Sequence, residues 1–279
     1  MIIIPKRIFY PDSDEETKGI RTHSRYVGNI YLLLKSNKLL FNLKTENVKY
    51  IAFKDEISKK IIKKMGIVQY TVESIKKEYE YSKMDEDFLP LALSWLWIKG
   101  YYAIFHLLSI LVAFEKTDDK YIFNKRFNSH QKIIIIVNEL LSKKPFNLND
   151  LNSVFSGSDL EKFCTKDHEN LKTLKIFNQN LYKLSIRKVF KDNRKKNGVK
   201  EARQKQYSIF NFCLNYREIF NYSGFHYIET ENEQNQKEIK NLYFTSHFVI
   251  LNIVNAIGKY LVEKTNGELR NKLLEITNL

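Results

Sequence analysis

The sequence predicts an all-α protein with a buried helical core. Only nine glycines and four prolines occur among 279 residues, and so few helix breakers favour long helices over turn-rich sheets. Hydrophobic residues make up 43% of the chain and aromatic residues 14%, enough for a packed core. Several segments also repeat apolar residues at intervals of three and four positions, the spacing of one helix face.

The beginning of the chain is expected to differ from the rest. We place an N-terminal extension at residues 1–69 and a helical domain at residues 70–279. Residues 1–53 have the pattern of an irregular leader. Within them, residues 31–42 carry two apolar runs around a polar centre, which fits either a short hairpin or a helix with a break.

Residues 54–84 are polar in composition but helical in pattern. Their apolar residues fall on one helix face, as the following four show: Ile57, Ile61, Ile62 and Met65.

The most apolar part of the chain is residues 88–114, which is long enough to cross a membrane. Lys99, Gly100 and His106 lie well inside it, however, and its tryptophans and tyrosines crowd the middle instead of the two ends. A helix buried inside a bundle can also be apolar all round. We therefore expect a core helix, and the membrane alternative is the less favoured one.

Further helices are expected along the rest of the chain. Asn128 or Ser129 is a suitable N-cap for a helix over residues 131–143. A polar stretch at residues 229–240 fits either a loop or the extended end of a helix. The other helical patterns cover residues 159–193, 200–222 and 245–264.

The charge balance favours a polyanionic partner. Lysine and arginine number 46 against 32 acidic residues, a formal net charge of +14. Such an excess suits RNA, DNA or an anionic membrane surface. The alternative is a general bias in composition, because lysine, isoleucine and asparagine are all abundant here.

Basic residues are concentrated in residues 183–205, where only Asp192 and Glu201 oppose them. Arginines and lysines spaced along one helix face there suit a row of phosphates. The alternative is an exposed, solvated helix end. The candidate nucleic-acid-binding residues are Arg187, Lys188, Lys191, Arg194, Lys195, Lys196 and Arg203.

The two cysteines, Cys164 and Cys213, form no CxxC motif and have no metal-ligand spacing. Two reduced thiols in a cytoplasmic protein are the simplest interpretation. The N-terminus is apolar before it is basic, the reverse of a signal peptide. Because the chain has no P-loop, GxGxxG, GxSxG or HExxH motif, no metal or cofactor is expected.

Three stretches resemble the HEPN domain family. Residues 100–108, GYYAIFHLL, are similar to its second-helix signature, roughly Ala-Tyr-Tyr-Ala-Met-Phe-His. Residues 129–132 resemble a later Ser/Thr-His-Lys stretch, and residues 216–222 resemble a late helix in which Asn221 stands where the family has Asp. The alternative is that His106 and the tyrosines are core residues with satisfied hydrogen bonds.

The resemblance implies a bundle of four or five helices, usually a homodimer, that acts on RNA or pairs with a nucleotidyltransferase or another protein. Active members are metal-independent ribonucleases, often of the defence or toxin–antitoxin type. Their motif is an arginine, four to six residues, and a histidine. A base must take the ribose 2′-OH proton, and a cation must hold the charge that grows on the phosphate.

This chain departs from that motif. Three residues separate Arg126 from His130, and eight separate Arg217 from His226. Nine steps along one helix rotate by about 900°, so the second pair converges only if Ser223-Gly224 breaks the helix. Arg217 and His226 are the candidate catalytic pair, against a surface arginine and a structural histidine. The function expected is RNA engagement with metal-independent cleavage, and the alternative is a non-catalytic scaffold that binds nucleic acid or a protein.

Overall fold

The computed structural model describes part of the chain. The described residues are Val27, Tyr31, 55–85, 87–116, 118, 120–124, 126–142, 209–222 and 233–277. Every regular element within these ranges is a helix, which confirms the all-α prediction. Of residues 31–42 only Tyr31 is described, so the hairpin alternative lies outside the described residues.

The predicted helices over residues 54–84, 88–114 and 131–143 are confirmed, and those over 200–222 and 245–264 are confirmed where the structure describes them. The predicted helix over residues 159–193 lies outside the described residues, and the sequence patterns did not predict α4 or α12. The long polar segment forms α2, the apolar segment forms α3, and a short α4 separates α3 from α5. The bounds are α2 Asp55–Ser82, α3 Leu89–Lys116, α4 Lys120–Phe123, α5 His130–Ser142, α10 Ile209–Tyr222, α11 Glu233–Lys264 and α12 Gly267–Thr277. Helix α2 runs through position 69, where the N-terminal extension was expected to end.

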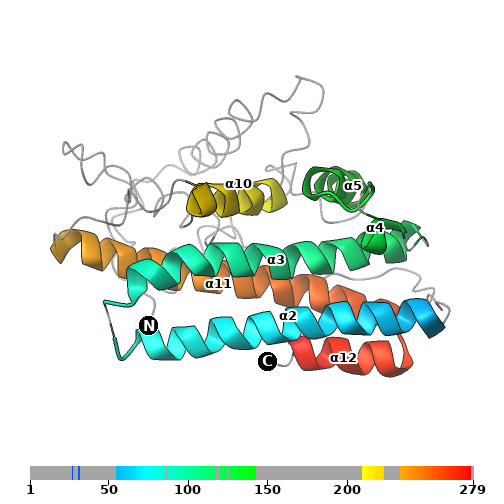
Figure 1. The fold of residues 1–279 in the computed structure, drawn as a ribbon, viewed down its shortest axis with the longest axis horizontal. Helices are drawn as coiled ribbons and strands as arrows, with labels where there is room; N and C mark the ends of the chain where they lie inside the picture. The colour runs from blue at the N-terminus through cyan, green and yellow to red at the C-terminus, as the bar shows by residue number, and fades with distance from the viewer. Residues whose placement is uncertain are drawn as a thin grey trace, which may run out of the picture.

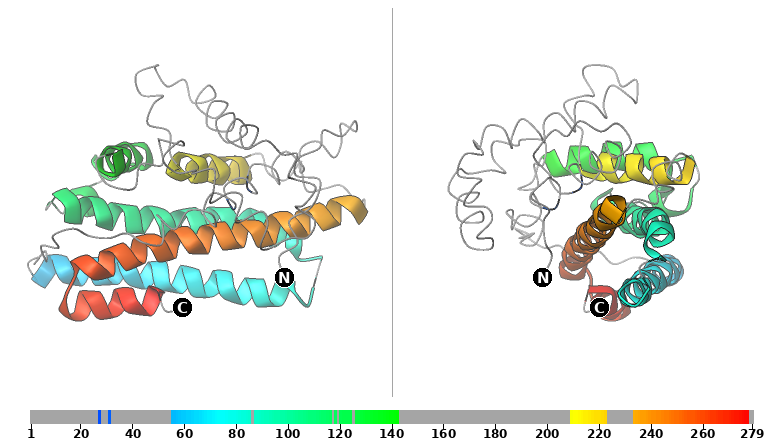
Figure 2. Two further views of the ribbon diagram at one scale, coloured as in Figure 1. Left: turned by 180° about the vertical axis from the view of Figure 1, so that it is seen from behind. Right: turned by 90° about the vertical axis from the view of Figure 1, so that its left-hand side faces the viewer.

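Helix α3 is the centre of the arrangement. It packs against α2, α4, α5, α10 and α11, and α12 closes the bundle against α2 and α11. Figure 1 shows α2 on one side of α3 and the pair α5 and α10 on the other. Figure 2, seen from behind, shows α11 covering the rear of α3. Each side of α3 therefore meets a different neighbour.

Burial of α3 explains its composition. Nineteen of its residues are buried, as expected for a helix that must be apolar on nearly every side. It is long and apolar enough to cross a membrane, yet 78% of its most apolar window is buried inside the bundle. This is compatible with a core helix of a soluble protein. Five of its less buried positions recur every three or four residues and form one stripe: Leu91, Trp95, Lys99, Tyr102 and His106.

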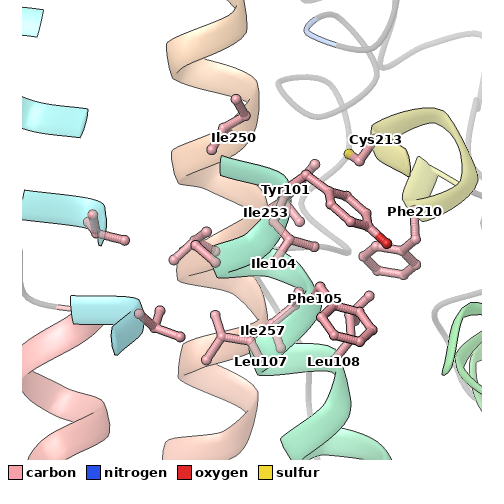
Figure 3. Close-up of a cluster of buried hydrophobic side chains, with 14 of the residues drawn as sticks. Tyr101, Ile104, Phe105, Leu107, Leu108, Phe210, Cys213, Ile250, Ile253 and Ile257 are labelled. Atoms are coloured by element: carbon pink, nitrogen blue, oxygen red, sulfur yellow. The ribbon is translucent and has the colours of Figure 1, made fainter. Parts of the chain in front are cut away.

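Gly100 allows α3 and α11 to approach closely. A Cβ at this position would lie 2.6 Å from Cγ2 of Ile250 on α11, much closer than two carbon atoms can come. Figure 3 shows side chains of α3 lying between α11 on one side and α10 on the other, and the labelled residues are Tyr101, Ile104, Phe105, Leu107, Leu108, Phe210, Cys213, Ile250, Ile253 and Ile257.

Polar contacts join α3 to its neighbours at several levels. The indole nitrogen of Trp97 donates to Ser246 Oγ on α11 at 3.0 Å. Near the other end of α3, Glu115 accepts hydrogen bonds from Tyr260 and Lys264 of α11. These side-chain contacts fix the register of α3 against α11, because each pairs one defined position on each helix.

Candidate functional site

Arg217 is the predicted site residue that the structure describes. It lies on α10, partly buried, next to Tyr216, which packs into the core. His226 lies outside the described residues. The seven candidate nucleic-acid-binding residues of segment 183–205 lie outside them as well. The structure therefore bears directly on the surroundings of Arg217.

Helix α10 holds Arg217 against Tyr102 of α3. Apolar residues of α10 pack onto α3, among them Phe212, whose ring centroid lies 6.0 Å from that of Trp97. Arg217 Nη2 then donates to Tyr102 Oη at 2.8 Å, and the guanidinium carbon lies 5.4 Å from the Tyr102 ring centroid. A guanidinium at this distance gains both a hydrogen bond and a cation–π contact.

Helix α5 brings a histidine to the neighbouring tyrosine. His130 is the first residue of α5, and its Nδ1 lies 2.8 Å from Tyr101 Oη. Its ring centroid is 4.2 Å from that of Phe105 and 5.8 Å from that of Tyr102. The imidazole is thus held on three aromatic residues of α3, and it shares Tyr102 with Arg217.

The turn before α5 fixes the position of His130. Ser129 occupies the position directly before the helix, and its carbonyl accepts from Ile133 N–H at 3.0 Å. Asn128, the other predicted cap, ties the turn to the bundle instead. Its amide donates to the Ile122 carbonyl at 2.6 Å and its Oδ1 accepts from Ser109 of α3 at 3.1 Å.

Burial and neighbouring charges keep the imidazoles of this region neutral. Burial lowers the pKa of His130 below its ordinary value, and the positive charge of Arg217 lowers it further. Burial raises the pKa of Tyr101, which therefore stays protonated. At neutral pH the cluster thus contains a neutral histidine beside a permanent cation.

His106 extends the cluster by one helix turn along α3. Burial, followed by the charges of Lys64 and His130, lowers its pKa to about 4. Its Nδ1 is buried without a hydrogen-bond partner among the described residues. The described residues thus supply no partner for this nitrogen, whereas the hydroxyls of Tyr101 and Tyr102 both have partners among them.

The donor set of the cluster suits an anion. Arg217 supplies a guanidinium, Tyr101 and Tyr102 supply phenols, and His130 supplies an imidazole. In the described part of the chain, no three histidine, cysteine or acidic side chains are grouped so that they would hold a metal ion. Such donors can bind phosphate oxygens and move a proton.

Sequence reasoning missed His130 as the neighbour of Arg217. It sought a histidine that follows the arginine along the chain, whereas His130 comes 87 positions earlier, as the numbering of the two residues shows. The consecutive tyrosines 101 and 102 were the available signal. Two adjacent residues on a helix point about 100° apart, so they can receive partners from two different helices.

Comparison of the chain with models of protein families, with curated proteins and with solved structures finds no match.

Proposed function

We propose that this chain is a HEPN-like, RNA-engaging protein that cleaves RNA without a metal ion, in the manner of a defence or toxin ribonuclease. The observation that carries the proposal is the placement of Arg217 beside a neutral imidazole on the adjacent tyrosines of α3. In this proposal Arg217 binds the scissile phosphate.

The convergence of the three HEPN-like stretches supports the family assignment. Residues 100–108 lie on α3, residues 129–132 span the start of α5, and residues 216–222 lie on α10. These stretches are far apart in the sequence, but the contacts of Tyr101 and Tyr102 bring them together. Stretches that share one site in space are a stronger sign of a common function than three separate matches.

The chemistry of the site supports RNA as substrate. A guanidinium recognises phosphate through paired N–H donors and keeps its charge at every physiological pH. A neutral imidazole can accept the proton of a ribose 2′-OH. The net charge of +14 favours the approach of a polyanion. A homodimer, a nucleotidyltransferase or other protein partner, and a cytoplasmic location belong to the same proposal.

Cleavage of RNA in EDTA tests this function. We expect the full-length protein to cut RNA with the chelator present and to leave 2′,3′-cyclic phosphate ends, because the nucleophile is the adjacent 2′-OH. Arg217→Ala should lower kcat/KM by about 10²-fold or more, the usual loss for one charge-stabilising group. Arg217→Lys keeps the charge but loses the paired donors. Its kcat/KM should therefore lie between that of the wild type and that of Arg217→Ala.

Thermal unfolding of the same variants shows whether activity is lost because Arg217 no longer binds the phosphate or because the variant does not fold. Cleavage that requires Mg²⁺, or that Arg217→Ala leaves unchanged in folded protein, would contradict the proposal. RNA binding without cleavage would favour the second function, a non-catalytic scaffold. The departure of the arginine and histidine spacing from the ribonuclease motif is the observation that favours this scaffold.

A further inference from the structure

Helices α3, α5 and α10 contribute to one small cluster. Its guanidinium comes from α10 and its imidazole comes from α5. Arg217 of α10 and His130 of α5 both contact the Tyr101–Tyr102 pair of α3. Helices α5 and α10 also contact each other directly. His130 is thus a neighbour of Arg217 because of the way the helices pack, and not because of the interval between the two residues in the sequence.

We infer that His130 is the base of the proposed ribonuclease, and that Tyr101 positions it beside the phosphate clamp Arg217. The inference rests on the proposed function and adds a catalytic residue to it. It also explains why the chain can lack the spaced arginine–histidine motif: packing of α5 and α10 on α3 supplies the pair.

The reaction balances with the groups at hand. The 2′-OH proton passes to Nε2 of His130 while the 2′-oxygen forms a bond to phosphorus. The bond between phosphorus and the 5′-oxygen breaks, the departing 5′-oxygen takes a proton from water, and the hydroxide so formed takes the proton from Nε2 of His130, which restores the base. Arg217 holds the phosphate oxygens on which negative charge grows. The products are a 2′,3′-cyclic phosphate and a 5′-OH.

The contact with Tyr101 determines which nitrogen acts. A base at Nε2 requires the proton of the neutral ring to sit on Nδ1, where it can be donated to the Tyr101 oxygen 2.8 Å away. A phenol oxygen can accept this bond. The same contact stabilises the imidazolium that forms during the reaction, as an oriented acceptor does for other catalytic histidines.

His106 is less suited to the role, although it is near. Its Nδ1 is buried and its pKa of about 4 makes it a weak base. His130 is the first residue of α5 and, like His106, is half-buried. The groups around His130 are Tyr101, Tyr102 and His106 from α3 and Arg217 from α10.

The decisive variant is His130→Asn, measured with a single-stranded RNA in EDTA. The asparagine amide can replace Nδ1–H toward Tyr101 but offers nothing in place of Nε2, so kcat should fall by about 10²-fold or more. His247→Gln is the matched control, because His247 lies on α11 and stacks on Tyr79 of α2. It should leave cleavage unchanged, and thermal unfolding reports whether each variant is folded.

Two pH profiles test whether His130 is the titrating group. Wild-type kcat/KM should fall as the pH drops below 6.5, the ordinary pKa of histidine. In Arg217→Gln the residual activity should begin to fall at a higher pH, because the cation that disfavours imidazolium is gone. In Tyr101→Phe kcat should fall at unchanged KM, with the acidic limb moved to lower pH.

The outcomes separate this inference from the proposed function. A wild-type protein that cuts no RNA overturns both. A wild type that cuts RNA, with folded His130→Asn equally active and His226→Ala inactive, overturns only the inference and assigns the base to His226. Acidic limbs that do not move in Arg217→Gln and Tyr101→Phe would likewise remove His130 from the reaction.

Discussion

Two helical glycines differ in what surrounds them. Gly100 faces Ile250 across the contact of α3 with α11, where a Cβ would come within 2.6 Å of the isoleucine side chain. Gly66 lies on the exposed side of α2, and no atom of the described residues lies within 4 Å of such a Cβ. The same substitution therefore has opposite consequences at the two positions.

Gly100→Ala should destabilise the protein by about 1–3 kcal/mol, since Ile250 must shift inside a packed core. Gly66→Ala should stabilise it by about 0.5–1 kcal/mol, because alanine costs less backbone entropy in a helix. Denaturant unfolding of both variants measures the two free energies. Equal effects of the same sign would mean that Gly100 does not set the distance between the helices.

At the residue scale, the candidate site could be predicted only in part. Arg217 was proposed because residues 216–222 resemble the late helix of the HEPN family and because a histidine follows at position 226. Its contact with Tyr102 and the approach of His130 were not found, because they depend on how α10 and α5 dock on α3. No local pattern encodes the relative placement of helices that are so far apart in the chain.

At the scale of the elements, α3 and α11 each carry a half-buried histidine. Burial is the main cause that lowers the pKa of His106 and of His247 to about 4. Between that value and the ordinary pKa of 6.5, the unfolded chain binds more protons than the folded protein. Above pH 6.5 these histidines therefore cost the folded protein no stability. As the pH falls from 6.5 to about 4, the free energy of unfolding decreases.

Acidification from pH 7 to pH 4 should cost up to roughly 3 kcal/mol for each of the two histidines, less where water screens them. The check is urea unfolding across this range. His106→Gln should flatten the profile relative to wild type, because glutamine has no proton to gain. A profile that keeps its full slope in this variant would show that His106 titrates normally in the folded state.

The helices themselves were largely predictable because their apolar spacing is regular. The patterns at residues 54–84 and 88–114 became α2 and α3 with small shifts at the ends. The start of α11 at Glu233 lies well before the apolar pattern that begins at residue 245. Its first turns are rich in glutamate, glutamine and lysine, which favour helix but give no core-facing periodicity.

At the scale of the whole molecule, the net charge of +14 attracts RNA in general, and this attraction has to be distinguished from phosphate contacts made by particular residues. Reversal of Lys191, Arg194, Lys195 and Lys196 to glutamate should weaken RNA binding. It should also flatten the salt dependence by about one unit of slope for each phosphate that the protein no longer neutralises. Affinity measured over a range of salt concentrations checks both effects.

The matched control reverses four lysines that are exposed on α2 and α11: Lys59, Lys63, Lys77 and Lys259. Both sets change the total charge equally, so a general electrostatic attraction predicts equal losses of affinity. A larger loss in the first set would locate the phosphate contacts in segment 183–205. Equal losses would leave the basic composition as the explanation.

The residues of the candidate site lie on helices that differ in how many neighbouring helices pack against them. Helix α3 is enclosed by α2, α11 and further neighbours, whereas α5 and α10 pack chiefly on α3 and on each other within the described residues. Helices with fewer neighbours open at a lower free-energy cost than the core to which they are attached. Tyr101 and Tyr102 lie on the helix with the most neighbours in the described part of the chain, and His130 and Arg217 lie on helices with fewer. If α5 or α10 opens locally before the core does, the proposed site comes apart in a molecule that is otherwise folded.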